Sequence, residues 1–106
     1  MNTIGTHKRP LFMPKRLFAS FERHVRHETA RNIEVMGIAM GKVYRNGKKV
    51  NRVIIPDQTG TATTCTITSF GETQMVEAAL EYNETILGWF HTHPRHDNVL
   101  SSVCLL

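Results

Sequence analysis

The 106-residue chain has only two cysteines, Cys65 and Cys104, and no apolar run long enough for a membrane helix. Because a helix that spans a bilayer needs about 20 consecutive apolar residues, the sequence predicts no membrane span. Residues 1–9 lack the apolar centre of a signal peptide, which predicts a cytoplasmic protein. In that reducing compartment we expect the two cysteines to be free thiols or metal ligands and not a disulfide.

Internal repeats, low-complexity tracts and linkers are also lacking, and the length suits one domain with its own core. The sequence is 41% hydrophobic and 21% charged, which is typical of globular domains. The formal net charge is +4, and basic residues gather early in the chain: Lys8, Arg9, Lys15, Arg16, Arg23, Arg26 and Arg31. Aromatic residues do not interleave with them as a nucleic-acid platform requires, so we expect the solvated face of a helix and no nucleic-acid partner.

Two amphipathic helices are predicted from the spacing of apolar residues. After an irregular lead-in over residues 1–12, Pro14 can open a helix that continues to about Thr29; its apolar side carries Leu17, Phe18, Phe21 and Val25. Ser69 and Glu72 have the spacing of a capping box for a second helix, which ends near Asn83. The apolar stripe of that helix is expected to pack in the core: Met75, Val76, Ala79 and Leu80.

Strands are predicted between and after these helices. Residues 34–44 and 50–55 are expected to pair as a hairpin, because Asn46-Gly47 is a strong turn signal. The threonine- and glycine-rich residues 57–68 predict a loop, with a short strand near its end. Residues 86–91 predict a buried strand. Helices alternating with strands favour an α/β layer fold with a mixed sheet.

Two histidines, His91 and His93, are separated by one residue at the end of that last strand. Side chains alternate in direction along a strand, so both imidazoles lie on one side and can bind one zinc ion. A pair of histidines that binds nothing is the alternative. His96 and Asp97 are weaker candidate ligands nearby, whereas Trp89 is most simply a core residue.

The residues around this pair resemble the JAMM (MPN-plus) zinc metallopeptidases. Their signature is H-x-H-P-x6-S-x2-D, and the chain matches it at His91, His93, Pro94 and Ser101. The amino-acid sequence of residues 87–94 and 100–103 is most similar to that of the AMSH-type deubiquitinases, which have Leu-Gly-Trp-x-His-Thr-His-Pro and Leu-Ser-Ser-Val. An upstream glutamate of the family corresponds to Glu34, and the resemblance covers roughly residues 11–103.

The resemblance implies a three-layer α-β-α sandwich with a mixed sheet, related to cytidine deaminases, over residues 13–106. It implies a Zn²⁺-dependent isopeptidase that hydrolyses ubiquitin–lysine bonds, with lysine-63-linked chains as the AMSH-type substrate. The implied partners are ubiquitin or polyubiquitin and endosomal-sorting adaptor proteins, and the implied location is cytoplasmic with endosome association. In that family a segment between the second strand and the catalytic strand contacts the distal ubiquitin, and residues 57–83 correspond to it here.

The same resemblance implies a role for each site residue. His91 and His93 are the zinc ligands, Glu34 is the general acid/base, and Ser101 steadies the attacking water and the developing oxyanion. The alternative for Glu34 is a solvated glutamate that opens a strand. The alternative for Ser101 is a helix N-cap, because a helix is expected to start there, and the two roles are compatible.

Cys104 stands where the family has its aspartate ligand, and the chain ends two residues later. A thiolate can serve as the third zinc ligand, but it donates more charge than a carboxylate and weakens the metal as a Lewis acid. The helical turn that should hold this ligand has few residues left. We therefore expect weak zinc binding, slow or absent turnover, and a C-terminally incomplete domain such as a fragment of an active protease.

Two other classes of function remain open at this point. Cys104 favours a non-catalytic MPN scaffold or ubiquitin-binding module, whereas four intact positions favour the enzyme: Glu34, His91, His93 and Ser101. An unrelated structural-zinc or redox-sensing module would use both histidines with Cys65 and Cys104, although C-x-x-C spacing is lacking.

Overall fold

The computed structural model describes residues 2–4, 11–30, 33–92 and 100–105, and the side chains of residues 11–26 and 33–92. The main sheet has six strands in the order β1-β2-β4-β3-β7-β8. In chain order they are β1 (Asn2–Ile4), β2 (Leu11–Met13), β3 (Met36–Tyr44), β4 (Gly47–Ile54), β7 (Thr85–Thr92) and β8 (Leu100–Leu105). Among these strands β2 and β4 pair in parallel and the other neighbours pair antiparallel, so the sheet is mixed.

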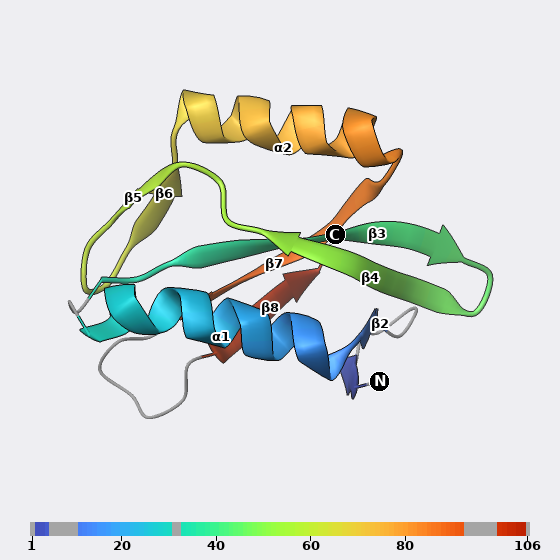
Figure 1. Cartoon of the computed structure of the whole chain (residues 1–106), viewed down its shortest axis with the longest axis horizontal. Helices are drawn as coiled ribbons and strands as arrows, with labels where there is room; N and C mark the ends of the chain where they lie inside the picture. Colours follow the sequence, from blue (N-terminus) through green and yellow to red (C-terminus); the bar gives the residue numbers. More distant parts are fainter. Residues whose placement is uncertain (1, 5–10, 31–32, 93–99, 106) are drawn as a thin grey trace.

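Two helices cover the main sheet. Helix α1 (Lys15–Ala30) and helix α2 (Ser69–Tyr82) lie on opposite sides of it (Figure 1). A small second sheet pairs β5 (Gln58–Gly60) with β6 (Cys65–Ile67). This arrangement confirms the α/β fold with a mixed sheet. No helix within the described residues is long and apolar enough to cross a membrane.

Helix α1 begins where the sequence predicts. The carbonyl of Pro14 accepts from the backbone N–H of Leu17 at 3.1 Å, which starts the first turn. Phe21 and Val25 face the sheet and are buried, whereas four basic residues of the same helix are exposed: Lys15, Arg16, Arg23 and Arg26. For these four residues, the expected solvated helix face is confirmed.

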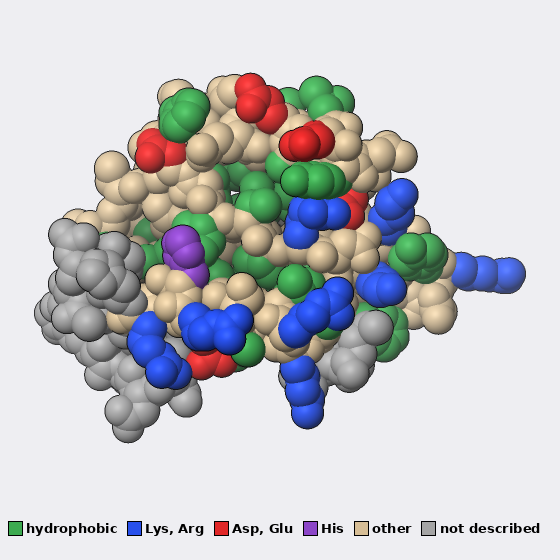
Figure 2. All heavy atoms as spheres, in the orientation of Figure 1, with side chains coloured by type: hydrophobic (Ala, Val, Ile, Leu, Met, Phe, Trp, Pro, Cys, Tyr) green, Lys and Arg blue, Asp and Glu red, His purple; other side chains and the backbone are tan. Residues whose placement is uncertain are grey.

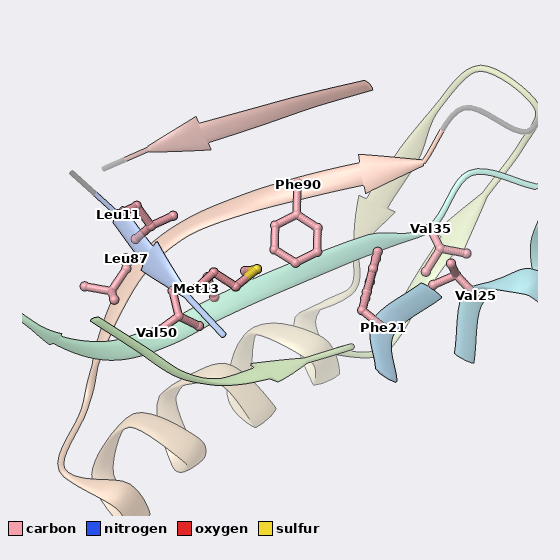
Figure 3. Close-up of a cluster of buried hydrophobic side chains, with 9 residues drawn as sticks. Leu11, Met13, Phe21, Val25, Val35, Val50, Leu87 and Phe90 are labelled. Atoms are coloured by element: carbon pink, nitrogen blue, oxygen red, sulfur yellow. The ribbon is translucent and has the colours of Figure 1, made fainter. Parts of the chain in front are cut away.

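A connected apolar core lies between α1 and the strands (Figure 3). Its buried members are Leu11, Met13, Phe21, Val25, Val35, Ala39, Val50, Leu87 and Phe90. The rings of Phe21 and Phe90 meet edge to face with their centroids 4.7 Å apart. Complete burial of such a side chain stabilises the fold by about 1.5–3 kcal/mol. Phe90 comes from β7, so the core holds the strand that carries His91.

The β3–β4 hairpin is confirmed, with its turn displaced by one residue. Tyr44 pairs with Gly47, so Arg45 and Asn46 form the turn and Gly47 opens β4 with φ 156°. A residue with a side chain rarely adopts that φ, which accounts for the glycine. The predicted short strand near the end of residues 57–68 is β6, and its partner β5 was not expected.

The apolar stripe predicted to pack in the core is wrong for Val76 and Leu80, which are 58% and 77% exposed. The orientation of α2 is set at Gly71, where a Cβ atom would collide with the carbonyl oxygen of Asp57. Leu80 follows Gly71 by two and a half helical turns of 3.6 residues, so it lies on the opposite side of α2. The helix therefore turns these apolar residues toward solvent.

The ends of α2 were placed to within one residue. The N-cap is Thr68 and not Ser69, because the Thr68 hydroxyl accepts from Gly71 N at 3.0 Å. Either residue can cap, but only a cap at Thr68 places Gly71 at the third helical position, against Asp57. The helix ends at Asn83, which adopts the left-handed conformation with φ 51°.

Two further differences concern the ends of the sheet. The segment 1–12, expected to be irregular, contains β1 and the first two residues of β2. Residues 100–105, expected to begin a helix, form strand β8 paired with β7. The outer backbone groups of β7 need hydrogen-bond partners, and a neighbouring strand supplies them.

Candidate active site

Glu34 and His91, far apart in the sequence, meet at one end of the β3–β7 pair. Met36 pairs with His91 across the two strands, which brings the residues before β3 against the end of β7. The Nδ1 atom of His91 lies 2.9 Å from Glu34 Oε1. Glu34 is only 4% exposed, which excludes a solvated glutamate at the start of a strand.

Thr92 fixes the backbone next to Glu34. Its hydroxyl accepts from Val35 N at 3.0 Å, and its own N–H donates to Val35 O at 3.0 Å. Thr92 is fully buried, so these bonds are shielded from water. Side chains alternate along a strand, so Thr92, between His91 and His93, faces the opposite side from the two histidines. A polar side chain buried there almost always has a hydrogen-bond partner. The spacing of the two histidines therefore already indicated a structural role for Thr92, which the sequence analysis did not predict.

The β5–β6 hairpin holds the same segment from the other side. Glu34 N donates to Thr61 O at 2.8 Å, and Met36 N donates to Gln58 Oε1 at 2.7 Å. The amide of Gln58 also donates to Met36 O at 3.0 Å, so this side chain acts as a neighbouring strand would. Gly60 allows the close approach, because a Cβ there would stand 2.5 Å from Glu34 O. No local pattern in the sequence predicts these contacts.

Cys65 of β6 also faces Glu34. Its Sγ atom donates to Glu34 Oε1 at 3.9 Å. Burial, followed by the charge of Glu34 and this hydrogen bond, raises the pKa of the Cys65 thiol to about 11. The second carboxylate oxygen, Glu34 Oε2, is buried and has no hydrogen-bond partner among the described residues. One oxygen of the carboxylate is therefore engaged and the other is left available.

The structure brings together only some of the predicted site residues. His93, His96 and Asp97 lie outside the described residues. The backbone of β8 places Ser102 opposite His91 and Cys104 opposite Trp89, with Ser101 at an irregularity of the pairing. Ser101 is thus in a strand, and the expectation that it caps a helix is wrong. Cys104 likewise has a paired strand around it in place of the expected helical turn.

Trp89 was expected in the core, and the structure places it at an intermediate burial opposite Ile38. Its neighbours on the strand, Gly88 and Phe90, are the buried ones. The core face of β7 is therefore the one that carries Phe90.

The residues that the structure describes fit a zinc site in their chemistry. A metal-binding imidazole commonly has a carboxylate at its other ring nitrogen, and Glu34 occupies that place beside His91. The unsatisfied Oε2 atom adds a buried acceptor at the same point. Within the described residues there is no group of three or more His, Cys, Asp or Glu side chains that could hold a metal. His91 is the predicted zinc ligand whose side chain the structure describes. The other two predicted ligands, His93 and Cys104, fall outside the described side chains.

Comparison with known proteins agrees with the motif. Residues 9–106 match the family described as JAB1/Mov34/MPN/PAD-1 ubiquitin protease. The AMSH-like protease sst2 of Schizosaccharomyces pombe is 36% identical over 101 residues, which is 95% of this chain and 23% of that protein. STAM-binding protein-like A of Danio rerio is 38% identical over 98 residues, 92% of this chain and 23% of its own length.

A human relative extends this comparison. The AMSH-like protease of Homo sapiens is 33% identical over 104 residues, which covers 98% of this chain and 23% of the relative. The chain therefore spans less than a quarter of the length of these relatives.

Proposed function

The chain belongs to the JAB1/Mov34/MPN/PAD-1 ubiquitin protease family, and from this premise we propose that it is a zinc-dependent isopeptidase that cleaves ubiquitin–lysine bonds. The observation that carries the proposal is the buried Glu34 carboxylate 2.9 Å from His91 Nδ1. Removing a carboxylate from water costs free energy, so buried carboxylates are found mainly where they have a function. A buried glutamate beside a candidate metal ligand therefore favours a catalytic role.

In this proposal His91 and His93 hold the metal, and Cys104 supplies a third ligand in place of aspartate. Zinc, when bound, polarises the scissile carbonyl and lowers the pKa of a bound water. The chain's own acid/base is Glu34, whose Oε2 is the oxygen left without a partner. It accepts a proton from the attacking water and delivers it to the leaving lysine amine. Ser101 steadies the oxyanion.

We propose that ubiquitin docks on the outer face of α2. Phe70, Val76 and Leu80 are 62%, 58% and 77% exposed on this helix, within the segment that corresponds to the family's distal-ubiquitin contact. Apolar and acidic side chains alternate on the upper surface in Figure 2, where α2 lies. An exposed apolar patch rimmed by polar groups is typical of a protein-binding surface. Lysine-63-linked ubiquitin chains are the proposed substrate, because the sequence of the motif is similar to that of AMSH-type deubiquitinases.

We further propose recruitment by an endosomal-sorting adaptor. Two relatives carry the name STAM-binding protein, from Rattus norvegicus and Mus musculus, each 34% identical to this chain. The proposal for location is therefore cytoplasmic with endosome association.

A second candidate function is a non-catalytic scaffold or ubiquitin-binding module, and Cys104 is the observation that favours it. A thiolate in place of a carboxylate makes a poorer Lewis acid of the metal, while ubiquitin docking on α2 needs no metal. Both candidate functions use the ubiquitin-docking surface on α2, but only the isopeptidase requires zinc-dependent cleavage.

Cleavage of lysine-63-linked diubiquitin, measured beside zinc stoichiometry, separates the two functions. The chain and its Cys104→Asp variant are compared, with Thr66→Asp, at an exposed position of β6, as a matched control for a new carboxylate elsewhere. We expect about one zinc per chain and faster cleavage in Cys104→Asp than in the chain itself. Zinc binding and ubiquitin binding without cleavage in either protein would establish the scaffold instead.

A further inference from the structure

Cys65 lies beside Glu34, and the proposed chemistry gives this side chain no role. Its Sγ atom lies 3.9 Å from Glu34 Oε1, the oxygen that also faces His91 Nδ1. Glu34 is more than nine-tenths buried and its Oε2 atom lacks a partner among the described residues. The thiol thus donates to a carboxylate whose Oε1 atom also lies 2.9 Å from His91 Nδ1, whereas Oε2 has no hydrogen-bond partner among the described residues.

We propose that Cys65 is a positioning residue of this site, whose S–H donates to Glu34 Oε1 and so leaves Oε2 as the oxygen that exchanges protons. The proposal rests on the proposed function, in which Glu34 is the acid/base. A carboxylate that can rotate presents either oxygen, whereas one fixed on two sides presents a single oxygen in a defined direction.

The protonation state of Cys65 agrees with a donor. Burial and the neighbouring carboxylate raise the pKa of this thiol to about 11, so it stays protonated at neutral pH. A thiolate is the form that binds metals, attacks electrophiles and is oxidised readily. In the metal-free chain Cys65 is therefore a protonated thiol that can donate a hydrogen bond to Glu34.

The backbone of the hairpin sets the distance between the two side chains. Cys65 pairs with Gly60 across β5 and β6, and Gly60 lies directly against the Glu34 backbone. Glu34 N is itself bonded to Thr61 O, in the loop that joins these strands. The thiol therefore belongs to the same hairpin whose backbone is hydrogen-bonded to Glu34.

Infrared spectroscopy of the S–H stretch tests the contact without any need for activity. A thiol bonded to a carboxylate absorbs at lower wavenumber than a free one, and the Cys65 band is assigned by its loss in Cys65→Ser. We expect this band to move to higher wavenumber in Glu34→Gln and to stay in place in Glu72→Gln, which removes an exposed carboxylate on α2. A Cys65 band at the same wavenumber in the chain and in Glu34→Gln would overturn the proposal.

Carboxylate NMR then tests the positioning itself. The ¹³Cδ signal of Glu34, assigned with Glu34→Gln, is compared in the zinc-free chain, in Cys65→Ala and in Cys65→Ser. The signal is expected to shift in Cys65→Ala and to remain near its original position in Cys65→Ser, because serine keeps a donor. The exposed neighbour Thr66 gives the control Thr66→Ala, which should leave the signal unchanged. An unshifted Glu34 signal in Cys65→Ala contradicts a positioning role.

Kinetics separate this proposal from the proposed function. In Cys65→Ala we expect kcat to fall several-fold with KM unchanged, and in Cys65→Ser we expect partial recovery of kcat. Cleavage at the original kcat in Cys65→Ala removes the role of Cys65 while the proposed function stands. If the expected thiol and carboxylate signals are found but neither the chain nor Cys104→Asp cleaves diubiquitin, the proposed function is overturned, and the catalytic part of this inference with it.

Discussion

At the scale of single residues, the site depends on polar groups that the surrounding backbone holds in place. Thr92 and Gln58 form hydrogen bonds with the residues on the C-terminal side of Glu34, and neither has a charge or a catalytic role of its own. Such groups matter because a catalytic side chain must be held within fractions of an ångström.

Replacing Thr92 by valine keeps the shape of the side chain but removes its hydroxyl. Val35 N then has no acceptor in a fully buried position, which costs about 1–3 kcal/mol of unfolding free energy. Urea denaturation of the chain, Thr92→Val and Thr92→Ser measures this loss. Thr92→Ser should retain most of the stability; equal losses in both variants would show that the methyl group and not the hydroxyl matters.

At the scale of elements, sequence patterns suffice to locate the helices and one hairpin, but not to orient α2 or to place the β5–β6 hairpin. The spacing of apolar residues located both helices, and Asn46-Gly47 located the β3–β4 hairpin, because these signals are local. The rotation of α2 could not be predicted, because it depends on the contact of Gly71 with Asp57, distant in the sequence. The contact of Cys65 with Glu34 is unpredictable for the same reason.

The exposure of α2 leads to the second prediction. A double variant with Val76→Ser and Leu80→Ser removes apolar groups that lie mostly in solvent, so its unfolding free energy should change by less than about 0.5 kcal/mol. Leu87→Ala is the matched contrast, since Leu87 is 1% exposed and its truncation costs about 2–5 kcal/mol. An NMR titration with ubiquitin should show weaker binding by the double variant. Destabilisation comparable to that of Leu87→Ala would mean that these residues pack in the core.

Arg52 of β4 and Glu84, which lies between α2 and β7, join two elements at the other end of β7. Arg52 Nε lies 2.6 Å from Glu84 Oε1, Asn51 Nδ2 donates to Glu84 Oε2 at 2.9 Å, and the guanidinium stacks 3.5 Å from the Tyr82 ring centroid. Burial alone would raise the pKa of Glu84, but the hydrogen bonds from Arg52 and Asn51 outweigh it and keep the pKa below its usual value.

This pair gives a prediction about pH. Because the pKa of Glu84 is lower when folded, its stabilisation is present above the unfolded value of about 4.3 and is lost as pH falls through the folded value. Glu84→Gln should therefore lower the unfolding free energy by about 1 kcal/mol at pH 7, and by progressively less below about pH 4. Urea denaturation of the chain and of Glu84→Gln, at pH 7 and below about pH 4, measures the difference in unfolding free energy. Glu77→Gln, at an exposed position, is the control. A loss that does not depend on pH would contradict the charged contact.

At the scale of the whole molecule, the family motif predicted the fold class and the meeting of Glu34 with His91. The helix expected at Ser101 failed because the open edge of β7 offers strand pairing to residues 100–105. That preference belongs to the assembled sheet and not to the sequence Leu-Ser-Ser-Val. The third-ligand candidate, Cys104, consequently lies in a strand.

Zinc should act on the stability of the whole chain. A ligand that binds only the folded state adds about 2.7 kcal/mol at a concentration one hundred times its dissociation constant. We expect added zinc to raise the melting temperature, EDTA to reverse the rise, and His91→Ala to abolish it. The Cys65→Ser variant should respond as the chain does. A rise of equal size in His91→Ala would place the metal elsewhere.

The central claim is that Glu34 is the acid/base beside a metal held by His91. Its most direct test is the rate of lysine-63-linked diubiquitin cleavage by Cys104→Asp, with and without Glu34→Gln, at equal zinc content. Loss of general acid/base catalysis predicts a rate about 10²–10⁴-fold lower with Glu34→Gln, while zinc remains bound. Cleavage at the same rate in both proteins would contradict the claim.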